Sequence, residues 1–155
     1  MNMEINTDTL KNTAEKLLSL MSVSAKIEVT YDKKDEVFVV DIDAGETTGL
    51  LIGKRGETLL SIQNILGVLY KQETGEWAKI VVNVGDYRQK EEEYLKSLAE
   101  NTAQRAVETG NPQNLYNLKA WQRRVIHMFL TDNKDVATTS EGEGEDRYLI
   151  VSPKK

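Results

Sequence analysis

The alternation of apolar and polar positions predicts a helix and two strands at the start of the chain. Over residues 7–21, apolar side chains recur at helical spacing on one face, and Thr7 or Asp8 can cap this helix. Residues 26–31 alternate between apolar and polar side chains, which is typical of a half-buried strand. After a polar turn, residues 37–42 predict a second strand with Phe38, Val40 and Ile42 on one side. These two strands are therefore predicted to form a hairpin.

The segments after the hairpin predict helix, loop, helix and strand. Residues 47–52 predict a short helical segment, residues 57–71 a longer helix, and residues 78–84 a third strand. Apolar side chains cover much of the longer helix, which is predicted to be largely buried: Leu59, Leu60, Ile62, Ile65, Leu66, Val68 and Leu69. The complete order predicts a three-stranded sheet with helices packed on one face.

The second part of the chain predicts two more helices and two more strands. Residues 86–109 have the pattern of a long helix, which Gly110-Asn111-Pro112 ends. Residues 118–130 predict another helix, and residues 136–140 and 147–151 predict strands. The core-facing side of the last helix is predicted to consist of apolar residues: Leu118, Trp121, Val125, Met128 and Phe129. The pattern as a whole predicts an α+β fold, divided near residue 85.

The composition is that of a globular protein, with 39% hydrophobic and 29% charged residues among 155. No long apolar run is present, and the first residues lack a basic segment followed by an apolar one. Neither a transmembrane helix nor a signal peptide is therefore expected. The chain has no cysteine, which is typical of a reducing compartment and predicts a cytoplasmic protein.

The net charge of −5 is unevenly distributed along the chain. Residues 1–49 carry 5 positive and 10 negative side chains, whereas residues 50–90 carry 6 and 4, and residues 101–134 carry 5 and 2. Basic regions on an acidic protein predict selective, salt-sensitive binding to an anionic partner rather than indiscriminate coating of nucleic acid.

The first basic region contains a short motif in which two glycines flank two cations, Gly53-Lys54-Arg55-Gly56. Glycine lets the chain turn tightly and brings its backbone close to a ligand. Gly56 is predicted to open a helix, whose unpaired N–H groups favour anions, and Lys54 and Arg55 add two full charges. The segment is therefore predicted to hold a phosphate backbone.

Other phosphate-binding motifs do not fit this segment. A P-loop requires G-x-x-x-x-G-K-[ST], but Gly49 precedes Gly53 by four positions rather than five, and Arg55 replaces the Ser or Thr that would hold Mg²⁺. A dinucleotide-binding fingerprint requires glycine where Leu51 stands. The remaining alternative is a tight helix–helix turn with solvated charges.

The second basic region contains the single histidine of the chain, His127. Arg123 lies four positions before it, so the two side chains are neighbours on the predicted helix, and Lys119 lies one turn earlier. An Arg–His stripe suits a phosphate, with Arg as a bidentate donor. The alternative is that His127 only bonds to a neighbouring loop; Ile126 also interrupts the stripe, which suggests that part of it faces other protein.

Residues 26–84 resemble a KH domain of the prokaryotic type, on the strength of Leu51-Ile52-Gly53-Lys54-Arg55-Gly56 followed by Glu57-Thr58-Leu59. A KH domain uses its GXXG loop to clamp the backbone of single-stranded nucleic acid. The resemblance implies that Gly53 to Gly56 hold the sugar–phosphate backbone and that Ile52 lines the groove for the bases.

Residues 86–153 resemble an R-three-H domain, whose name describes the pattern Arg-x-x-x-His. Asp86-Tyr87-Arg88 and Thr138-Thr139-Ser140-Glu141-Gly142, followed by Arg147, also match its setting beside a KH domain. The joint order resembles the bacterial Jag family, also called SpoIIIJ-associated or KhpB/EloR proteins. The implied fold is a three-stranded KH domain with helices on one face, followed by a small α/β R-three-H domain.

The expected domains are a KH domain at 26–85 and an R-three-H domain at 86–155, with residues 1–25 forming a helix that belongs to or precedes the KH domain. Ten residues are expected to bind RNA: Ile52, Gly53, Lys54, Arg55, Gly56, Arg88, Arg123, Arg124, His127 and Arg147. One histidine, no cysteine, no metal-ligand cluster and no P-loop argue against an enzyme, so no catalytic residue, metal or cofactor is expected.

The function expected from the residues and the resemblance is binding of single-stranded RNA, with single-stranded DNA as an alternative ligand. The resemblance implies a bacterial post-transcriptional regulator linked to cell elongation or division, with a small KH-only protein as partner and no direct membrane insertion. The alternative function is a protein-interaction module, for example a membrane-insertase partner, whose acidic N-terminal helix and surface dock a protein while nucleic-acid binding is secondary.

Overall fold

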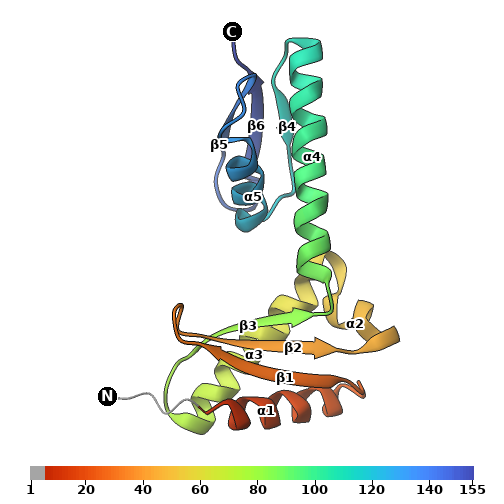
Figure 1. The fold of residues 1–155 in the computed structure, drawn as a ribbon, viewed down its shortest axis with the longest axis vertical. Helices are drawn as coiled ribbons and strands as arrows, with labels where there is room; N and C mark the ends of the chain where they lie inside the picture. The colour runs from red at the N-terminus through yellow and green to blue at the C-terminus, as the bar shows by residue number, and fades with distance from the viewer. Residues whose placement is uncertain (1–5) are drawn as a thin grey trace. The chain divides into compact units, whose positions relative to one another are not determined.

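The computed structural model describes residues 6–155, which divide into two compact units (Figure 1). The first unit ends at Arg88 and the second begins at Gln89, close to the division predicted from the sequence. Each unit has its own three-stranded sheet and its own cluster of buried apolar side chains.

The sheet of the first unit has the strand order β1-β2-β3. Strands β1 (Lys26–Asp32) and β2 (Val37–Asp43) pair antiparallel as the predicted hairpin, and β3 (Lys79–Val84) joins β2 in parallel. A parallel neighbour requires a long connection. That connection consists of α2 (Thr48–Ile52) and α3 (Glu57–Thr74), so the glycine motif lies within the crossover between β2 and β3.

Helices α1 (Thr7–Leu20) and α3 cover one face of this sheet, as Figure 1 shows. Alternate strand residues face the helices, as the period of two requires. The strands bury seven of these side chains: Ile27, Phe38, Val40, Ile42, Ile80, Val82 and Val84. The helices bury seven more against them: Leu10, Ala14, Leu18, Leu59, Ile62, Leu66 and Tyr70. The prediction of a three-stranded sheet with helices on one face is confirmed.

Two details of the first unit differ from the sequence prediction. Asn6, rather than Thr7 or Asp8, caps α1, and its side-chain oxygen accepts a hydrogen bond from the backbone N–H of Thr9 at 3.0 Å. Helix α3 is also less buried than predicted. Three of its apolar side chains are about half exposed: Leu60 at 46%, Ile65 at 45% and Val68 at 56%. The sheet lies on one side of α3 only, so a single stripe of the helix reaches the core.

The second unit consists of helices α4 and α5 and a second three-stranded sheet. Helix α4 (Tyr87–Thr109) begins at the end of the first unit, and α5 (Ala120–Leu130) follows β4 (Gln113–Leu115). Strands β5 (Val136–Glu141) and β6 (Tyr148–Pro153) complete an antiparallel sheet of order β4-β6-β5. Short 3-10 turns connect some of the described elements: Gly45–Thr47, Lys54–Gly56 and Gly144–Asp146.

The sequence did not predict β4, because its three residues are polar at the first two positions and too few to show a period. It forms because β6 offers a free edge: Gln113, Asn114 and Leu115 pair with Val151, Ile150 and Leu149. Strand β6 is therefore the central strand of this sheet. Arg147, directly before β6, lies within hydrogen-bond distance of Arg123 on α5.

The predicted core face of α5 is only partly correct. Leu118 and Val125 pack against the core, but Trp121, Met128 and Phe129 are exposed. Ile126, Leu130 and Gln122 are buried instead. Gln122 can occupy the core because both ends of its amide have partners: Nε2 donates to Glu91 Oε1 at 2.9 Å, and Oε1 accepts from the backbone N–H of Lys119 at 2.7 Å. A satisfied polar side chain carries little penalty when buried.

Candidate nucleic-acid interface

The glycine motif forms a turn between α2 and α3 that depends on left-handed backbone conformations. Gly53 ends α2 with φ 68° and ψ −172°, Arg55 has φ 54°, and Gly56 precedes α3 with φ 74°. The conformation of Gly53 lies in a region that is essentially restricted to glycine. The backbone therefore folds tightly at the tip, as the sequence motif predicts.

Neighbouring side chains leave no room for a Cβ at Gly53 and only tight room for one at Gly56. A Cβ on Gly53 would lie 2.1 Å from Thr58 Oγ1, and one on Gly56 would lie 3.0 Å from the hydroxyl of Tyr87. Gly53 thus brings the backbone against the first turn of α3, and Gly56 brings it against an aromatic side chain. Both glycines have a backbone conformation that favours glycine, and at Gly53 the contact with Thr58 also excludes a Cβ.

Lys54 and Arg55 are exposed at the tip of this turn, directly before the N-terminus of α3. No side chain in the described part of the chain caps that N-terminus, where N–H groups and the helix dipole favour anions. Glu57, in the first turn, is the one acidic side chain there. Ile52 is half-buried and packs against the core of the unit, and Gly56 is buried, so Lys54 and Arg55 are the exposed side chains of the predicted residues 52–56.

Arg88, also expected to contact RNA, has its guanidinium engaged within the first unit. Nε and Nη2 donate to the backbone carbonyl of Val82 at 3.2 and 3.0 Å, and Nη2 also donates to Gln63 Oε1 at 3.3 Å. Burial lowers the pKa of Arg88 from its ordinary value. Because Gln63 Oε1 accepts from the N–H of Val82 as well, the two side chains together close the edge of β3 at Val82. RNA contact by Arg88 stays a prediction.

The second unit brings four of the predicted residues to one hollow. Arg123, Arg124 and His127 reach it from α5, and Arg147 reaches it from the residue before β6. The hollow has a volume of about 340 Å³. Its other lining residues come from α5, β5 and β6: Ala120, Thr138, Ser140 and Leu149. Among residues 6–155 no acidic side chain lines it, whereas three arginines do, so the hollow is basic.

Hydrogen bonds hold two of these side chains in position. Nη1 of Arg123 donates to the backbone carbonyls of Leu118 at 2.6 Å and Arg147 at 3.3 Å, which ties α5 to the segment before β6. Nδ1 of His127 bonds to the hydroxyl of Thr138 on β5. Because Nδ1 makes this bond, Nε2 of His127 points away from Thr138. Arg124 is exposed.

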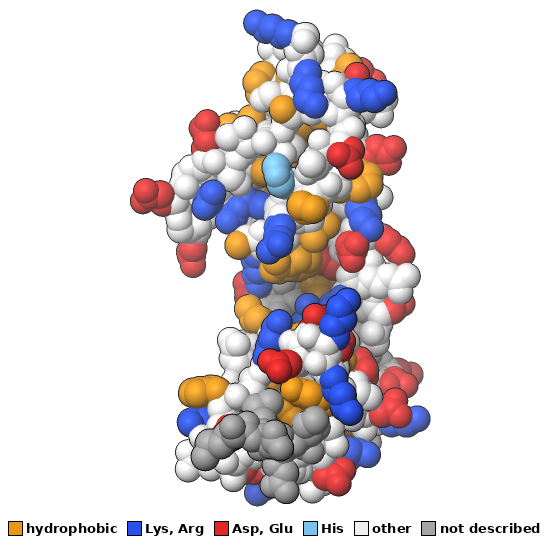
Figure 2. Space-filling view, turned by 60° about the vertical axis from the view of Figure 1, so that its left-hand side comes forward, with side chains coloured by type: hydrophobic (Ala, Val, Ile, Leu, Met, Phe, Trp, Pro, Cys, Tyr) orange, Lys and Arg blue, Asp and Glu red, His pale blue; other side chains and the backbone are white. Residues whose placement is uncertain are grey.

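The surface around His127 combines positive charge with exposed apolar groups. In Figure 2 the histidine, drawn in pale blue, lies at the surface of the second unit, with Lys or Arg side chains and apolar side chains around it. Trp121 and Met128 are exposed on α5. The sequence assigned both to the core, and Thr138 and Ser140 were not predicted as site residues. The alternation of β5 places these two on one face of that strand, which is the signal that could have identified them.

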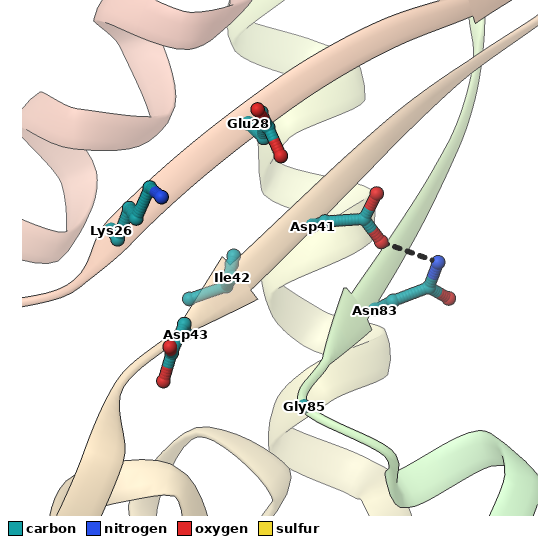
Figure 3. Close-up of a pocket in the computed structure, with 7 residues that line it drawn as sticks. All are labelled: Lys26, Glu28, Asp41, Ile42, Asp43, Asn83 and Gly85. Carbon is teal, nitrogen blue, oxygen red and sulfur yellow. Dashed lines mark hydrogen bonds between the residues drawn. The ribbon is translucent and has the colours of Figure 1, made fainter.

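The open face of the first sheet has the opposite chemistry. Lys26 and Glu28 from β1, Asp41 and Asp43 from β2, and Asn83 from β3 line a hollow of about 290 Å³, with the helices on the other side of the sheet (Figure 3). Nδ2 of Asn83 donates to Asp41 Oδ1 at 2.9 Å. Three carboxylates against one ammonium make this face acidic and unsuited to a phosphate backbone.

Within residues 6–155, no group of His, Asp and Glu side chains is arranged to hold a metal ion. In the same part of the chain, no helix has the length and the apolar character that crossing a bilayer requires.

Family models match both units. The model described as KhpA/KhpB, KH domain, matches residues 7–84, and that of the R-three-H domain matches residues 93–153. The first match includes α1, which the sequence prediction left as either belonging to or preceding the KH domain.

Proteins similar to this chain include three named RNA-binding protein KhpB. That of Clostridium symbiosum is 30% identical over 141 residues, which cover 91% of this chain and 63% of the relative. That of Lactiplantibacillus plantarum is 33% identical over 146 residues, 88% of this chain and 43% of the relative. That of Bacillus subtilis is 31% identical over 136 residues, 86% of this chain and 65% of the relative.

The chain thus spans less than two thirds of the length of each of these relatives. The KH match alone covers half of the chain, and the order of the two matched domains is the one inferred from the glycine motif and the Arg–His pair. The chain belongs to the KhpA/KhpB family of KH-domain proteins and carries an R-three-H domain after its KH domain.

Proposed function

We propose that the chain binds single-stranded RNA through two basic surfaces, the glycine turn of the first unit and the hollow of the second. The observation that carries this proposal is the convergence of Arg123, Arg124, His127 and Arg147 on one hollow without an acidic lining residue. Positive groups arranged in this way suit phosphates, which supply much of the affinity of a protein for nucleic acid.

The glycine turn supports the same function. It presents Lys54 and Arg55 beside the N-terminus of α3. The glycines on either side, Gly53 and Gly56, have no side chain that would block the approach of a ligand to the backbone. A GXXG loop of this kind clamps the nucleic-acid backbone in KH domains. The relatives described above are named RNA-binding protein KhpB, which supports RNA rather than DNA as the ligand of this chain.

Several finer statements belong to the same proposal. The protein acts without catalysis, in the cytoplasm, as a post-transcriptional regulator linked to cell elongation or division, as its family membership suggests. A small KH-only protein is its proposed partner, and single-stranded DNA is the proposed weaker ligand. Arg88 supports RNA binding in this scheme by keeping the edge of β3 in shape, since its donors are engaged there.

The alternative function, a protein-interaction module, is favoured by the acidic open face of the first sheet, with Glu28, Asp41 and Asp43 (Figure 3). Helix α1 was expected to be acidic, but it carries two acidic side chains, Asp8 and Glu15, and two basic ones, Lys11 and Lys16. A docking site for a protein such as a membrane insertase would therefore use the sheet rather than α1.

Affinity for RNA measured against salt concentration tests the proposed function. We expect a fluorescein-labelled single-stranded RNA of about 16 nucleotides to bind. The logarithm of its affinity should fall with the logarithm of the salt concentration with a slope of roughly −0.7 per neutralised phosphate. A double-stranded RNA of the same length should bind more weakly. No binding at low salt would contradict the proposal and favour the interaction module, whereas equal affinity for both forms would contradict the preference for single strands.

A further inference from the structure

A second hollow of the second unit lies between the C-terminal half of α4 and the end of α5. Its volume is about 720 Å³, compared with about 340 Å³ for the basic hollow. Residues of α4 from Glu100 to Glu108 form one wall, and residues of α5 and the following loop to β5 form the other. We refer to it as the α4–α5 groove.

The bottom and sides of the α4–α5 groove are apolar. Ala103, Leu130 and Val136 belong to the buried core and form its floor, whereas Val107 and Phe129 are 49% and 44% exposed. These two exposed side chains continue the apolar floor outward, so the groove offers a contiguous apolar surface that a partner could bury. Phe129 was expected in the core, so the groove accounts for a side chain that the fold does not bury.

The rim of the α4–α5 groove is acidic. Glu100 and Glu108 lie on the α4 side, and Asp132 and Asp135 lie in the loop after α5, while neither Lys nor Arg lines the groove. None of these four carboxylates forms an ion pair within residues 6–155. The ammonium of Lys154 lies beside this rim, where it donates to the carbonyl of Asn133 at 2.6 Å. Four carboxylates still outnumber this one cation, so the rim is net negative, which repels nucleic acid and attracts a positively charged partner.

Hydrogen bonds hold both sides of this rim in place. Nε2 of Gln104 donates to Glu108 Oε1 at 2.8 Å, which orients one carboxylate along α4. In the loop, Asn133 Oδ1 accepts from the backbone N–H groups of Asp135 and Val136 at 2.8 and 3.2 Å. The backbone N–H of Lys154 donates to the carbonyl of Asp135 at 2.7 Å. The groove therefore exists without a partner, which reduces the entropy that binding must overcome.

The groove and the basic hollow use different sides of α5. Phe129 follows His127 by two positions, which is about 200° around a helix, so the two side chains point in nearly opposite directions. No residue lines both hollows. A ligand in the groove would therefore leave the basic hollow open.

From these features we propose that the α4–α5 groove binds a short basic segment of another protein, anchored by two apolar side chains. Glu100 and Glu108 are eight residues apart, about 12 Å along the helix axis, which matches roughly two turns of a bound helix. The two anchors contact Val107 and Phe129, and lysine or arginine side chains beside them pair with the four carboxylates. The inference concerns a surface that RNA does not use and does not depend on RNA binding.

Binding of a defined peptide to the full chain tests this inference. The probe is a fluorescein-labelled peptide of about 12 residues with two leucines four positions apart among lysines and alanines. Its counterpart has glutamates in place of the lysines and should not bind. Phe129→Ala should weaken binding of the basic peptide by at least roughly tenfold, because an aromatic anchor is lost. Glu108→Lys should weaken it by roughly fivefold.

A charge-matched control separates the groove from general attraction to an acidic protein. Glu93 is exposed on α4 outside the groove, so Glu93→Lys changes the net charge equally and should leave affinity for the peptide unchanged. An equal loss in Glu93→Lys and Glu108→Lys, or no binding of the basic peptide, overturns the inference. The inference is also overturned if the unchanged protein sediments as a dimer and Phe129→Ala sediments as a monomer, because the groove would then hold a second copy of this chain.

Discussion

Gly53 and Thr58 lie so close together that a Cβ on Gly53 would be 2.1 Å from Thr58 Oγ1 and 2.7 Å from Thr58 Cβ. Rotation about the Cα–Cβ bond of Thr58 could move Oγ1, but its Cβ is fixed by the backbone of α3 and would still clash at 2.7 Å. Gly53 also has φ 68° and ψ −172°, which side chains rarely permit. The tip of the glycine turn is therefore sensitive to a single methyl group.

Gly53→Ala should destabilise the protein by roughly 2–4 kcal/mol, because the backbone strain and the clash add together. Chemical denaturation measures this change. Gly75→Ala is the matched control, since Gly75 has φ 82° but nothing within 4 Å of a Cβ. It should lose only roughly 1 kcal/mol, the penalty of a left-handed conformation alone. Equal losses in both variants would show that the contact with Thr58 is not rigid.

Replacing Lys54 and Arg55 together with aspartate should abolish most RNA binding by the first unit and preserve its fold. Both side chains are exposed, so neither is required by the core. The slope of the logarithm of RNA affinity against the logarithm of salt concentration should become less negative by roughly 1.4, which corresponds to two phosphates on a single strand. Fluorescence anisotropy over about 50 to about 300 mM salt measures this slope.

Lys33→Asp with Lys34→Asp is the control for this double substitution. These residues are exposed in the turn between β1 and β2, at the end of the strands opposite to the glycine turn. The change in net charge is the same, so RNA affinity should fall only slightly. A folded Lys54/Arg55 double variant with unchanged affinity would exclude the glycine turn as an RNA contact.

The sequence predicted the elements well where periodicity alone decides them. Strand β1 alternates cleanly, β2 places Phe38, Val40 and Ile42 on its buried face, and Gly110 ends α4 with φ 66°. Periodicity failed at α5, whose 11 residues carry two apolar stripes. Neighbouring elements decide which stripe is buried: α4 supplies Glu91 as a partner for Gln122, so the stripe that contains Gln122 faces inward. That partnership joins residues 31 positions apart and has no local signal.

The candidate site shows the same division between local and distant information. Residues 53–56 could be identified because their chemistry depends on adjacent positions. The approach of Arg147 to Arg123 depends on β6 being the central strand, which requires the unpredicted β4 at its edge. The engagement of Arg88 with Val82 was likewise not apparent, because it depends on the free edge of β3.

Arg123 and Arg124 should differ in their effect on stability while both contribute to RNA binding. Arg123→Ala leaves the carbonyls of Leu118 and Arg147 without this donor and should destabilise the protein by roughly 1–2 kcal/mol. Arg124→Ala, at an exposed position, should change stability by less than roughly 0.5 kcal/mol. In each variant, the slope of the logarithm of RNA affinity against the logarithm of salt concentration should become less negative by roughly 0.7.

Lys134→Ala provides the comparison for these arginines. Lys134 is exposed after α5 and does not line the basic hollow, so its removal should leave the salt slope nearly unchanged. If Arg124→Ala and Lys134→Ala had the same effect, the positive charge of the unit as a whole, rather than the hollow, would account for RNA binding.

Tyr70 should make the protein less stable at alkaline pH. Burial in the core raises the pKa of Tyr70 above its ordinary value of 10.0, and the nearby charge of Glu76 acts in the same direction. A phenol with a higher pKa in the folded state keeps its proton longer there than in the unfolded chain. Its contribution to stability is therefore complete below about pH 10 and is lost as the pH rises from there toward the pKa of the folded state.

Tyr70→Phe should remove this loss, because phenylalanine fills the same core position without an ionisable group. The free energy of unfolding in urea, compared at about pH 8 and about pH 10.5, should fall less in the variant than in the unchanged protein. Tyr94→Phe, at a residue that is 60% exposed, should retain the alkaline loss in full. Parallel behaviour of the two variants would mean that groups other than Tyr70, such as the lysines, cause the alkaline loss, and that ionising Tyr70 does not oppose folding.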